Sequence, residues 1–326
     1  THLFGGSAGR EGAALQLGGS IGNSLGKLFH FDEKDQHIMI MCGMSAAFSA
    51  LFGTPLAAAI FSMEVVSVGI MHYSALVPCV IASLTAHGIA SACGIAPEIF
   101  PIASIPAFTP KNALIIGIFA VLCALVSILF CTTLHNAERL YKRFFKNPYV
   151  RALAGGLIVI GLTMLAGNQT YNGTGMNIIT GCMEGKTVFP LAFLLKMIFT
   201  AATLGAGYKG GEIVPTLFIG STFGTFFASA FGCSIPLCAA VGMGAVFCGV
   251  TNSPITSLMI CFELFGFDGM PYFLIAIALS YMLSGYYGLY SSQKIIYSKY
   301  KTEYINRKTC LLDTNFPEMQ KFQPDL

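Results

Sequence analysis

The sequence predicts an all-α polytopic membrane protein made of two repeated halves with interrupted helices. The chain of 326 residues is 55% hydrophobic and only 10% charged, with a mean hydropathy of +0.70. Such a composition has too few polar side chains to cover a soluble globule of this size. Several apolar stretches are shorter than the ~20 residues that cross a bilayer. Short spans are tolerated where their ends meet other protein or a water-filled cavity, so the fold is expected to contain broken helices.

Apolar segments recur along the whole chain and are separated by short breaks. We expect helices over 13–29, 38–51, 55–71, 74–93, 112–134, 150–166, 188–206, 216–231, 237–250, 254–267 and 271–290. Pro55 stands at the first position of its helix, where proline is favoured. The 11 cysteines lie mostly within apolar stretches and show no CxxC pair, so we interpret them as buried apolar residues and expect no metal site.

Charge distribution predicts the orientation of the chain. Basic residues concentrate near 139–151 and 294–308, which places these segments in the cytoplasm by the positive-inside rule. The proline-rich segment 93–111 and the segment 167–186 are then expected outside. The net charge of +3 is too small to suggest nucleic acid.

The motif Gly9-Arg10-Glu11-Gly12 sets two charges at the front of a helix rich in small residues. Glycine on both sides frees the backbone, and free N–H groups at a helix N-terminus form an anion site aided by the helix dipole. Glu11 would compete with an anion for those donors. The alternative is a helix cap with an Arg10–Glu11 salt bridge at the membrane surface. A nucleotide-binding loop is excluded, because the Gly-Lys-Ser/Thr ending is absent.

A second glycine-rich turn, Gly210-Gly211-Glu212-Ile213-Val214-Pro215, enters another helix with small residues along it. Its N–H groups make a second candidate anion site.

An internal repeat connects the two motifs. A shift of 199 residues places Gly43-Met44-Ser45-Ala46-Ala47-Phe48 on Gly242-Met243-Gly244-Ala245-Val246-Phe247, Pro55 on Pro254 and Glu64 on Glu263 without a gap. Duplicated halves with interrupted helices are typical of secondary transporters and related channels, whose site lies where half-helices meet near the midplane. Two glycine-rich N-termini directed at one point would bind an anion.

Glu64 is an acid about nine residues into the helix that begins at Pro55. We expect it to make a structural hydrogen bond to a neighbouring broken helix rather than to act in transport. The basic segment from Gln293 is expected to start a helix that dips Tyr297 toward the midplane. The alternative for Tyr297 is an aromatic belt at the membrane interface, since other tyrosines crowd the same region.

These motifs, in this order, resemble the CLC family of chloride channels and anion/proton antiporters over nearly the whole chain. The resemblance implies a CLC-like inverted repeat of broken and tilted helices. Residues 1–134 would be the rest of the first repeat and its connection, 135–290 the second repeat, and 291–326 a cytoplasmic C-terminal helix and tail. It also implies a homodimer in the lipid bilayer of the cell or plasma membrane with one pore per subunit. We expect the dimer interface within 55–93 and 254–290, where apolar faces are continuous.

The same resemblance assigns roles to residues. Glu11 would be the gate and the proton carrier. The backbone of Glu212 and Ile213 and the hydroxyl of Tyr297 would hold the central ion, chloride or fluoride. The full predicted anion-binding set is Gly9, Arg10, Gly12, Glu212, Ile213, Val214 and Tyr297.

Three departures from the family pattern bear on function. The first anion-site loop of the family would lie before residue 1, so we expect a segment to precede this chain. Glu212 is a carboxylate where many relatives have an apolar residue. Val65 stands where antiporters commonly carry a second acid, which argues against ordinary chloride/proton exchange. Together with Gly210-Gly211-Glu212 it resembles the fluoride-selective subclass, although channel members lack that acid too.

The predicted function is halide transport gated by Glu11, by fluoride/proton or another anion/proton antiport, without a cofactor. An uncoupled chloride channel is the first alternative. An intramembrane enzyme is disfavoured because the six histidines show no HxxxH or HExxH spacing. A non-transporting membrane subunit is the remaining alternative.

Overall fold

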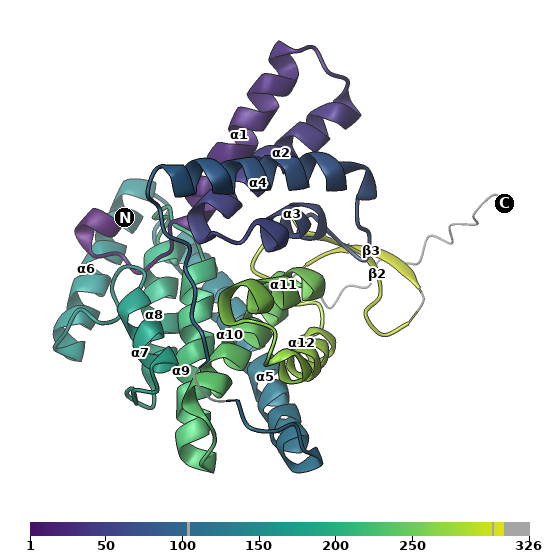
Figure 1. Cartoon of the computed structure of the whole chain (residues 1–326). Coiled ribbons are helices and arrows are strands. Elements are labelled where there is room, and N and C mark those ends of the chain that lie inside the picture. Colours follow the sequence, from purple (N-terminus) through teal and green to yellow (C-terminus); the bar gives the residue numbers. More distant parts are fainter. Residues whose placement is uncertain (103–104, 302, 310–326) are drawn as a thin grey trace.

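The protein is almost entirely helical, as the composition predicts. The computed structural model describes residues 1–102, 105–301 and 303–309, and its helices form two groups that pack on each other (Figure 1). The first group comprises α1 (Glu11–Leu28), α2 (Glu33–Phe52), α3 (Pro55–Glu64) and α4 (Leu76–Ala92). The second comprises α5 (Pro110–Phe144), α6 (Pro148–Ala166), α7 (Met176–Met183), α8 (Ala192–Gly205), α9 (Ile213–Phe231), α10 (Ile235–Thr251), α11 (Pro254–Phe265) and α12 (Met270–Leu283). Four described helices, counting the turn before α4, are long and apolar enough to cross a membrane.

The repeat found in the sequence is present in three dimensions. Helices α1 to α4 correspond in order to α9 to α12, and both proline-led helices, α3 and α11, are short. Gly53 and Asn252, 199 residues apart, each end the preceding helix in the left-handed conformation. The carboxylate of Glu64, at the end of α3, accepts a hydrogen bond at the start of α11. The carboxylate of Glu263, near the end of α11, accepts one at the start of α3. These two helices therefore run antiparallel, as an inverted repeat requires.

Glycine allows the first two helices of each repeat to approach closely. A Cβ on Gly43 would collide with the carbonyl oxygen of Gly18, so α1 and α2 meet backbone to backbone. In the second repeat a Cβ on Gly242 would collide with the carbonyl oxygen of Gly220, between α10 and α9. Small residues let membrane helices pack by van der Waals contact, because no hydrophobic force drives them together in lipid.

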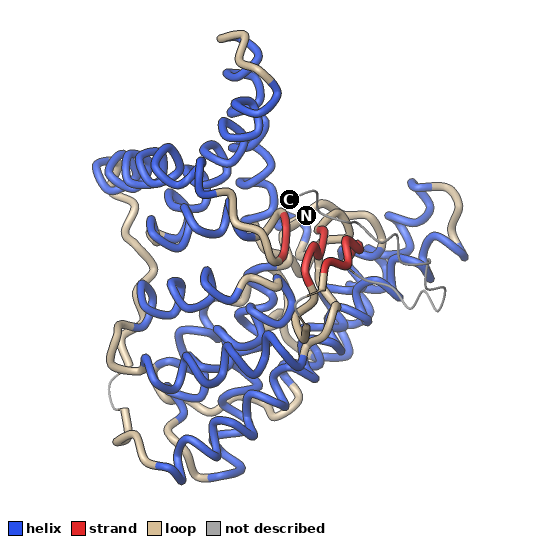
Figure 2. Tube along the Cα trace, turned by 90° about the vertical axis from the view of Figure 1, so that its right-hand side faces the viewer, coloured by secondary structure: helices blue, strands red, loops and turns tan. Residues whose placement is uncertain are grey.

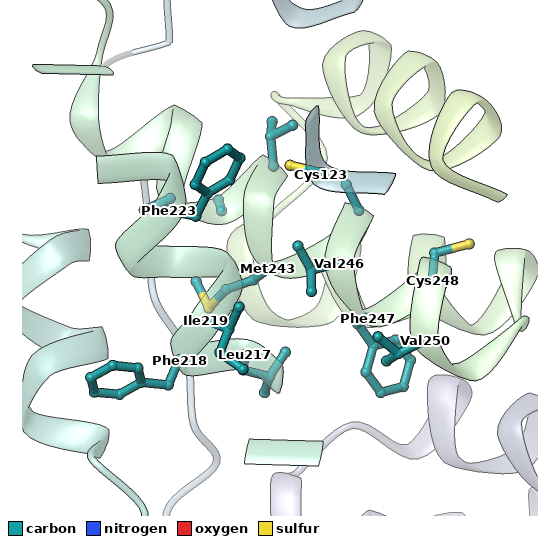
Figure 3. Packing of buried hydrophobic residues seen from close by; sticks show 14 of the residues in the cluster. Cys123, Leu217, Phe218, Ile219, Phe223, Met243, Val246, Phe247, Cys248 and Val250 are labelled. Carbon is teal, nitrogen blue, oxygen red and sulfur yellow. The ribbon is translucent and has the colours of Figure 1, made fainter. Parts of the chain in front are cut away.

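The main core lies around α9 and α10, whose residues are buried along almost their whole length. Figure 3 shows Phe223, Met243 and Val246 with Cys123 of α5 in this cluster. Burial on all sides is expected for a helix that is apolar on every face. The core therefore holds α9, and with it the second glycine-rich turn, in a fixed place.

Two expectations about boundaries need correction. Residues 294–297 and 304–308 form strands, not a C-terminal helix. Strand β2 (Lys294–Tyr297) pairs parallel with β1 (Ser67–Val68) and antiparallel with β3 (Tyr304–Lys308), and the three lie together in Figure 2. The strand conformation of β2 depends on backbone pairing with β1, which follows α3. The local sequence does not reveal this pairing. The rest of the predicted tail, 310–326, lies outside the described residues.

The other correction concerns the connection between the repeats. The predicted boundary between the repeats at 134/135 falls inside α5, which continues without interruption to Phe144. The segment 167–186, which is expected outside, contains the short helix α7.

Candidate functional site

The two glycine-rich turns meet each other directly. Gly9 and Gly211 form an antiparallel bridge in which each N–H donates to the other's carbonyl oxygen at 2.7 Å. Gly9 lies two residues before α1, and Gly211 lies two residues before α9. Equivalent positions of the two repeats therefore pair face to face, and the N-termini of α1 and α9 converge on one point.

The carboxylate of Glu11 occupies this point. Glu11 is the first residue of α1 and is only 1% exposed. The backbone N–H groups of Arg10 and Glu11, and that of Val214 from the facing helix, interact with its carboxylate. Its Oε2 atom has no hydrogen-bond partner among the described residues. A buried carboxylate oxygen without a partner is costly, so the side chain is incompletely satisfied in this position.

The glycines beside Glu11 provide space. A Cβ on Gly9 would collide with Oε2 of Glu11, and one on Gly211 would stand 2.7 Å from the same atom. A Cβ on Gly12 would stand 3.1 Å from the Cα of Gly211. Gly9, Gly12 and Gly211 do not have positive φ values. The expectation that Gly9 and Gly12 supply unusual backbone freedom is therefore replaced by close approach as the reason for glycine.

Arg10 is exposed and caps α1 by its backbone position, with no side-chain capping bond. The ion pairs between described side chains are Lys142–Glu138, Lys186–Glu184 and Lys301–Glu303. The alternative of an Arg10–Glu11 salt bridge is thus not the arrangement in the structure. Arg10 remains a predicted anion-binding residue through its main chain.

A cavity of about 840 Å³ lies beside the junction of the two turns. Residues of both repeats line it, including Gly12, Gln16 and Gly19 of α1, Phe61 of α3, Val65 and Val66, Gly210, Glu212 and Ile213, and Tyr290 and Gln293. Glu212 and Ile213, two of the predicted anion-binding residues, both line this cavity. Val65 lies on its wall, and the carbonyl of Val65 accepts a hydrogen bond from Nε2 of Gln293 at 2.8 Å. Val65 therefore presents an apolar side chain at the cavity wall.

The structure corrects the choice of tyrosine. Tyr297 lies on β2, is 46% exposed and packs against Tyr304 with ring centroids 5.9 Å apart. It does not line the cavity, whereas Tyr290 does. Sequence reasoning missed Tyr290 because several tyrosines share this region and only the path of the loop after α12 separates them.

Glu64 has the structural role expected of it. Its carboxylate accepts hydrogen bonds from the N–H groups of Ile255 and Thr256 at 3.1 and 2.8 Å and from the hydroxyl of Thr256 at 2.6 Å. It caps the first turn of α11, which satisfies N–H groups that have no partner within their own helix. Glu64 is thus committed to a helix end and not directed into the cavity.

Comparisons with known proteins found a matching family model and similar sequences. A family model described as voltage gated chloride channel matches residues 1–285. A chloride/fluoride channel protein of Pseudomonas syringae pv. tomato is 34% identical over 306 residues, which cover 92% of this chain and 68% of that protein. An H(+)/Cl(−) exchange transporter, ClcA, of Vibrio cholerae is 26% identical over 273 residues, covering 78% of this chain and 58% of that protein.

Two solved structures are similar over most of the chain. The crystal structure of a CLC-type fluoride/proton antiporter superposes with a TM-score of 0.87 at 35% identity, covering 90% of this chain and 74% of that one. A slow cyanobacterial Cl⁻/H⁺ antiporter gives a TM-score of 0.69 at 21% identity, covering 86% and 69%, and supports the fold alone.

Proposed function

Because the chain belongs to the voltage-gated chloride channel (CLC) family and is a multi-pass integral membrane protein, we propose that it exchanges fluoride for protons across its membrane. Glu11 is the gate and the proton carrier in this proposal. The similarity to a fluoride/proton antiporter of known structure and to a chloride/fluoride channel protein supports the choice of ion.

The position of the Glu11 carboxylate is the observation that carries the proposal. It lies among backbone N–H groups from two converging helix N-termini, which is the environment that binds anions. A carboxylate and a halide compete for the same donors, so only one of them occupies the point at a time. Ionised Glu11 therefore closes the anion path.

Protonation opens the path. Neutral Glu11 is a weaker acceptor than the carboxylate and gives up the N–H groups, which are then free for the anion. The unpartnered Oε2 atom means that leaving this position sacrifices no hydrogen bond at that oxygen. Proton uptake by Glu11 and anion entry are thereby coupled in one event.

Val65 implies that Glu11 carries the proton alone. Valine neither binds nor passes a proton, and Val65 lines the cavity at the position where other antiporters carry an acid. Exchange remains possible if the same carboxylate meets water on each side in turn. The cavity lined by Glu212, Tyr290 and Gln293 supplies one of these water-accessible sides.

The anion is held by both main chain and side chain. We assign the N–H groups of Gly12, Ile213 and Val214 and the hydroxyl of Tyr290 to the anion, with Tyr290 replacing Tyr297. The main chains of Gly9 and Arg10 support the first turn, and Glu212 places a carboxylate at the mouth of the site.

Proteoliposomes containing the protein test the coupling. A fluoride gradient is imposed without a proton gradient, and both ions are followed with a fluoride electrode and a pH-sensitive dye. Uphill proton movement driven by fluoride is expected, with chloride as a weaker driver. Anion flux without uphill proton movement would refute the antiporter and leave the uncoupled chloride channel, which Val65 favours as the second candidate. No anion flux at all would leave a non-transporting membrane subunit.

A further inference from the structure

Lys196, the fifth residue of the short apolar helix α8, is an ionisable residue and is fully buried, with 0% exposure. No carboxylate of the described residues lies within salt-bridge distance of it. Ionisable groups inside a membrane protein are costly and mark functional sites by default. A buried ammonium group without a carboxylate at salt-bridge distance is therefore a candidate functional group.

Neutral groups surround the ammonium. Its Nζ donates to the carbonyl oxygens of Tyr171 and Gly173 at 3.1 and 2.8 Å. It also lies over the ring of Phe218, 5.1 Å from the centroid. Carbonyl dipoles and a ring face stabilise a cation without cancelling its charge. The field of Lys196 thus extends into the surrounding low-dielectric interior, where charges act over longer distances than in water.

The contacts of Lys196 lead to both sides of the candidate site. Phe218 belongs to α9, whose first turn faces Glu11. On the other side, Gly173 donates its N–H to the carbonyl of Gly6, in the loop that leads to Glu11. The carboxylate of Glu11 and the ammonium of Lys196 interact electrostatically.

Two threonines on α8 hold the same loop. Thr200 and Thr203, one and two turns after Lys196, contact Ser7 through its hydroxyl and its N–H, each at 3.1 Å. The same helix α8 therefore carries both the buried ammonium group and the two threonines that bond the loop before Glu11. The threonine side chains are neutral, so their bonds to Ser7 can be removed by mutation while the ammonium group of Lys196 is kept.

We propose that Lys196 is a positioning residue for the transported anion, whose uncompensated charge holds the halide at the point that Glu11 otherwise occupies. The inference rests on the proposed function and adds the group that sets anion affinity there. Backbone N–H groups give the site its shape, and Lys196 gives it a net positive charge.

Kinetics of fluoride flux in proteoliposomes test this with neutral and charged replacements. Lys196→Gln keeps a donor for the two carbonyls and removes the charge, Lys196→Met removes both, and Lys196→Arg keeps the charge. We expect the KM for fluoride to rise at least fivefold in the two neutral variants, with the maximal rate changed less than twofold, and to return toward the wild-type value in Lys196→Arg.

Two control variants separate charge from structure. Lys299→Met removes a partly buried lysine, which donates hydrogen bonds to Asn252 and to the carbonyl of Tyr281 on α12 and does not line the cavity. Thr200→Val removes a bond to the loop and keeps Lys196. Both are expected to change the KM less than twofold. An equal rise in KM in Thr200→Val, or an unchanged KM in Lys196→Gln, would overturn the proposal.

Folding and the proposed function are checked independently. Each variant is examined by size-exclusion chromatography, and fluoride binding in detergent is measured by calorimetry, with weaker binding expected for Lys196→Gln. Equal binding of fluoride by Lys196→Gln and wild type overturns the role of Lys196. Absence of saturable flux in the wild type would instead refute the proposed function.

Discussion

Glu64 and Glu263 cap each other's helix. Glu263 accepts the N–H groups of Leu56 and Ala57 at 2.9 and 2.8 Å, at the start of the helix that ends with Glu64. Glu64 accepts the equivalent N–H groups of Ile255 and Thr256. The two bonds that each carboxylate accepts from backbone N–H groups correspond residue for residue under the 199-residue repeat. This reciprocal pair joins the two halves of the protein, because the carboxylate near the end of each short helix caps the start of the other.

Glu64→Gln and Glu263→Gln should each lower the free energy of unfolding, by about 1–3 kcal/mol, because an amide offers one acceptor oxygen where the carboxylate offers two. Denaturant unfolding in detergent measures this. Proton coupling should persist in the Glu64→Gln variant, since that carboxylate is engaged with a helix end. Loss of coupling with unchanged stability would instead make Glu64 a proton carrier.

Glu11→Gln should abolish proton coupling or gating while the protein stays folded. Glutamine reproduces the neutral state of the gate and cannot return to the anionic state, so the pH dependence of anion flux should disappear. Flux at several pH values in proteoliposomes provides the measurement. Glu33→Gln, at an exposed acid in the first turn of α2, serves as the control. A pH profile like that of the wild type would remove Glu11 from the gate.

Tyr290→Phe and Tyr297→Phe should behave differently, although both remove one hydroxyl group. Loss of a hydrogen bond to an anion worth about 1–1.4 kcal/mol corresponds to an affinity weaker by about five- to tenfold, which we expect for Tyr290→Phe only. Titration calorimetry with fluoride gives the comparison. The reverse order of effects would restore Tyr297 as the ligand.

Gly43→Ala and Gly242→Ala should each lower stability by about 1–3 kcal/mol, because the added methyl group collides with a carbonyl oxygen of the facing helix. Gly161→Ala in α6 meets no atom within 4 Å and should be neutral or stabilising by up to about 1 kcal/mol. Thermal unfolding of the three variants tests whether the close helix contacts are required. Equal effects at all three sites would contradict this packing argument.

A homodimer with its interface in 55–93 and 254–290 remains a prediction. Exposed apolar side chains on α4 and α12, among them Ile81 and Leu274, support it. Ile81→Trp should weaken dimerisation in detergent, whereas Leu157→Trp on α6, equally exposed at 61%, should not. Crosslinking and light scattering report the oligomeric state. A wild-type protein that is monomeric in both measurements would exclude the dimer.

Sequence alone determined the class of the protein and most of its frame. Low charge and recurrent apolar stretches required a membrane, since no soluble surface can be built from them. The repeat located α3 and α11 from Pro55 and Pro254, because these prolines mark helix starts through their fixed backbone angle. It also pointed to Glu11 and the two glycine-rich turns as candidates, because their local chemistry predicts anion binding.

Tertiary structure decided which groups meet. The bridge between Gly9 and Gly211, the reciprocal caps of Glu64 and Glu263 and the burial of Lys196 all join residues far apart in the chain, so no local pattern reports them. The choice of Tyr290 over Tyr297 depended on strand pairing with β1. Such contacts are set by packing of the two repeats against each other, where burial and backbone pairing outweigh the local preferences that sequence reasoning uses.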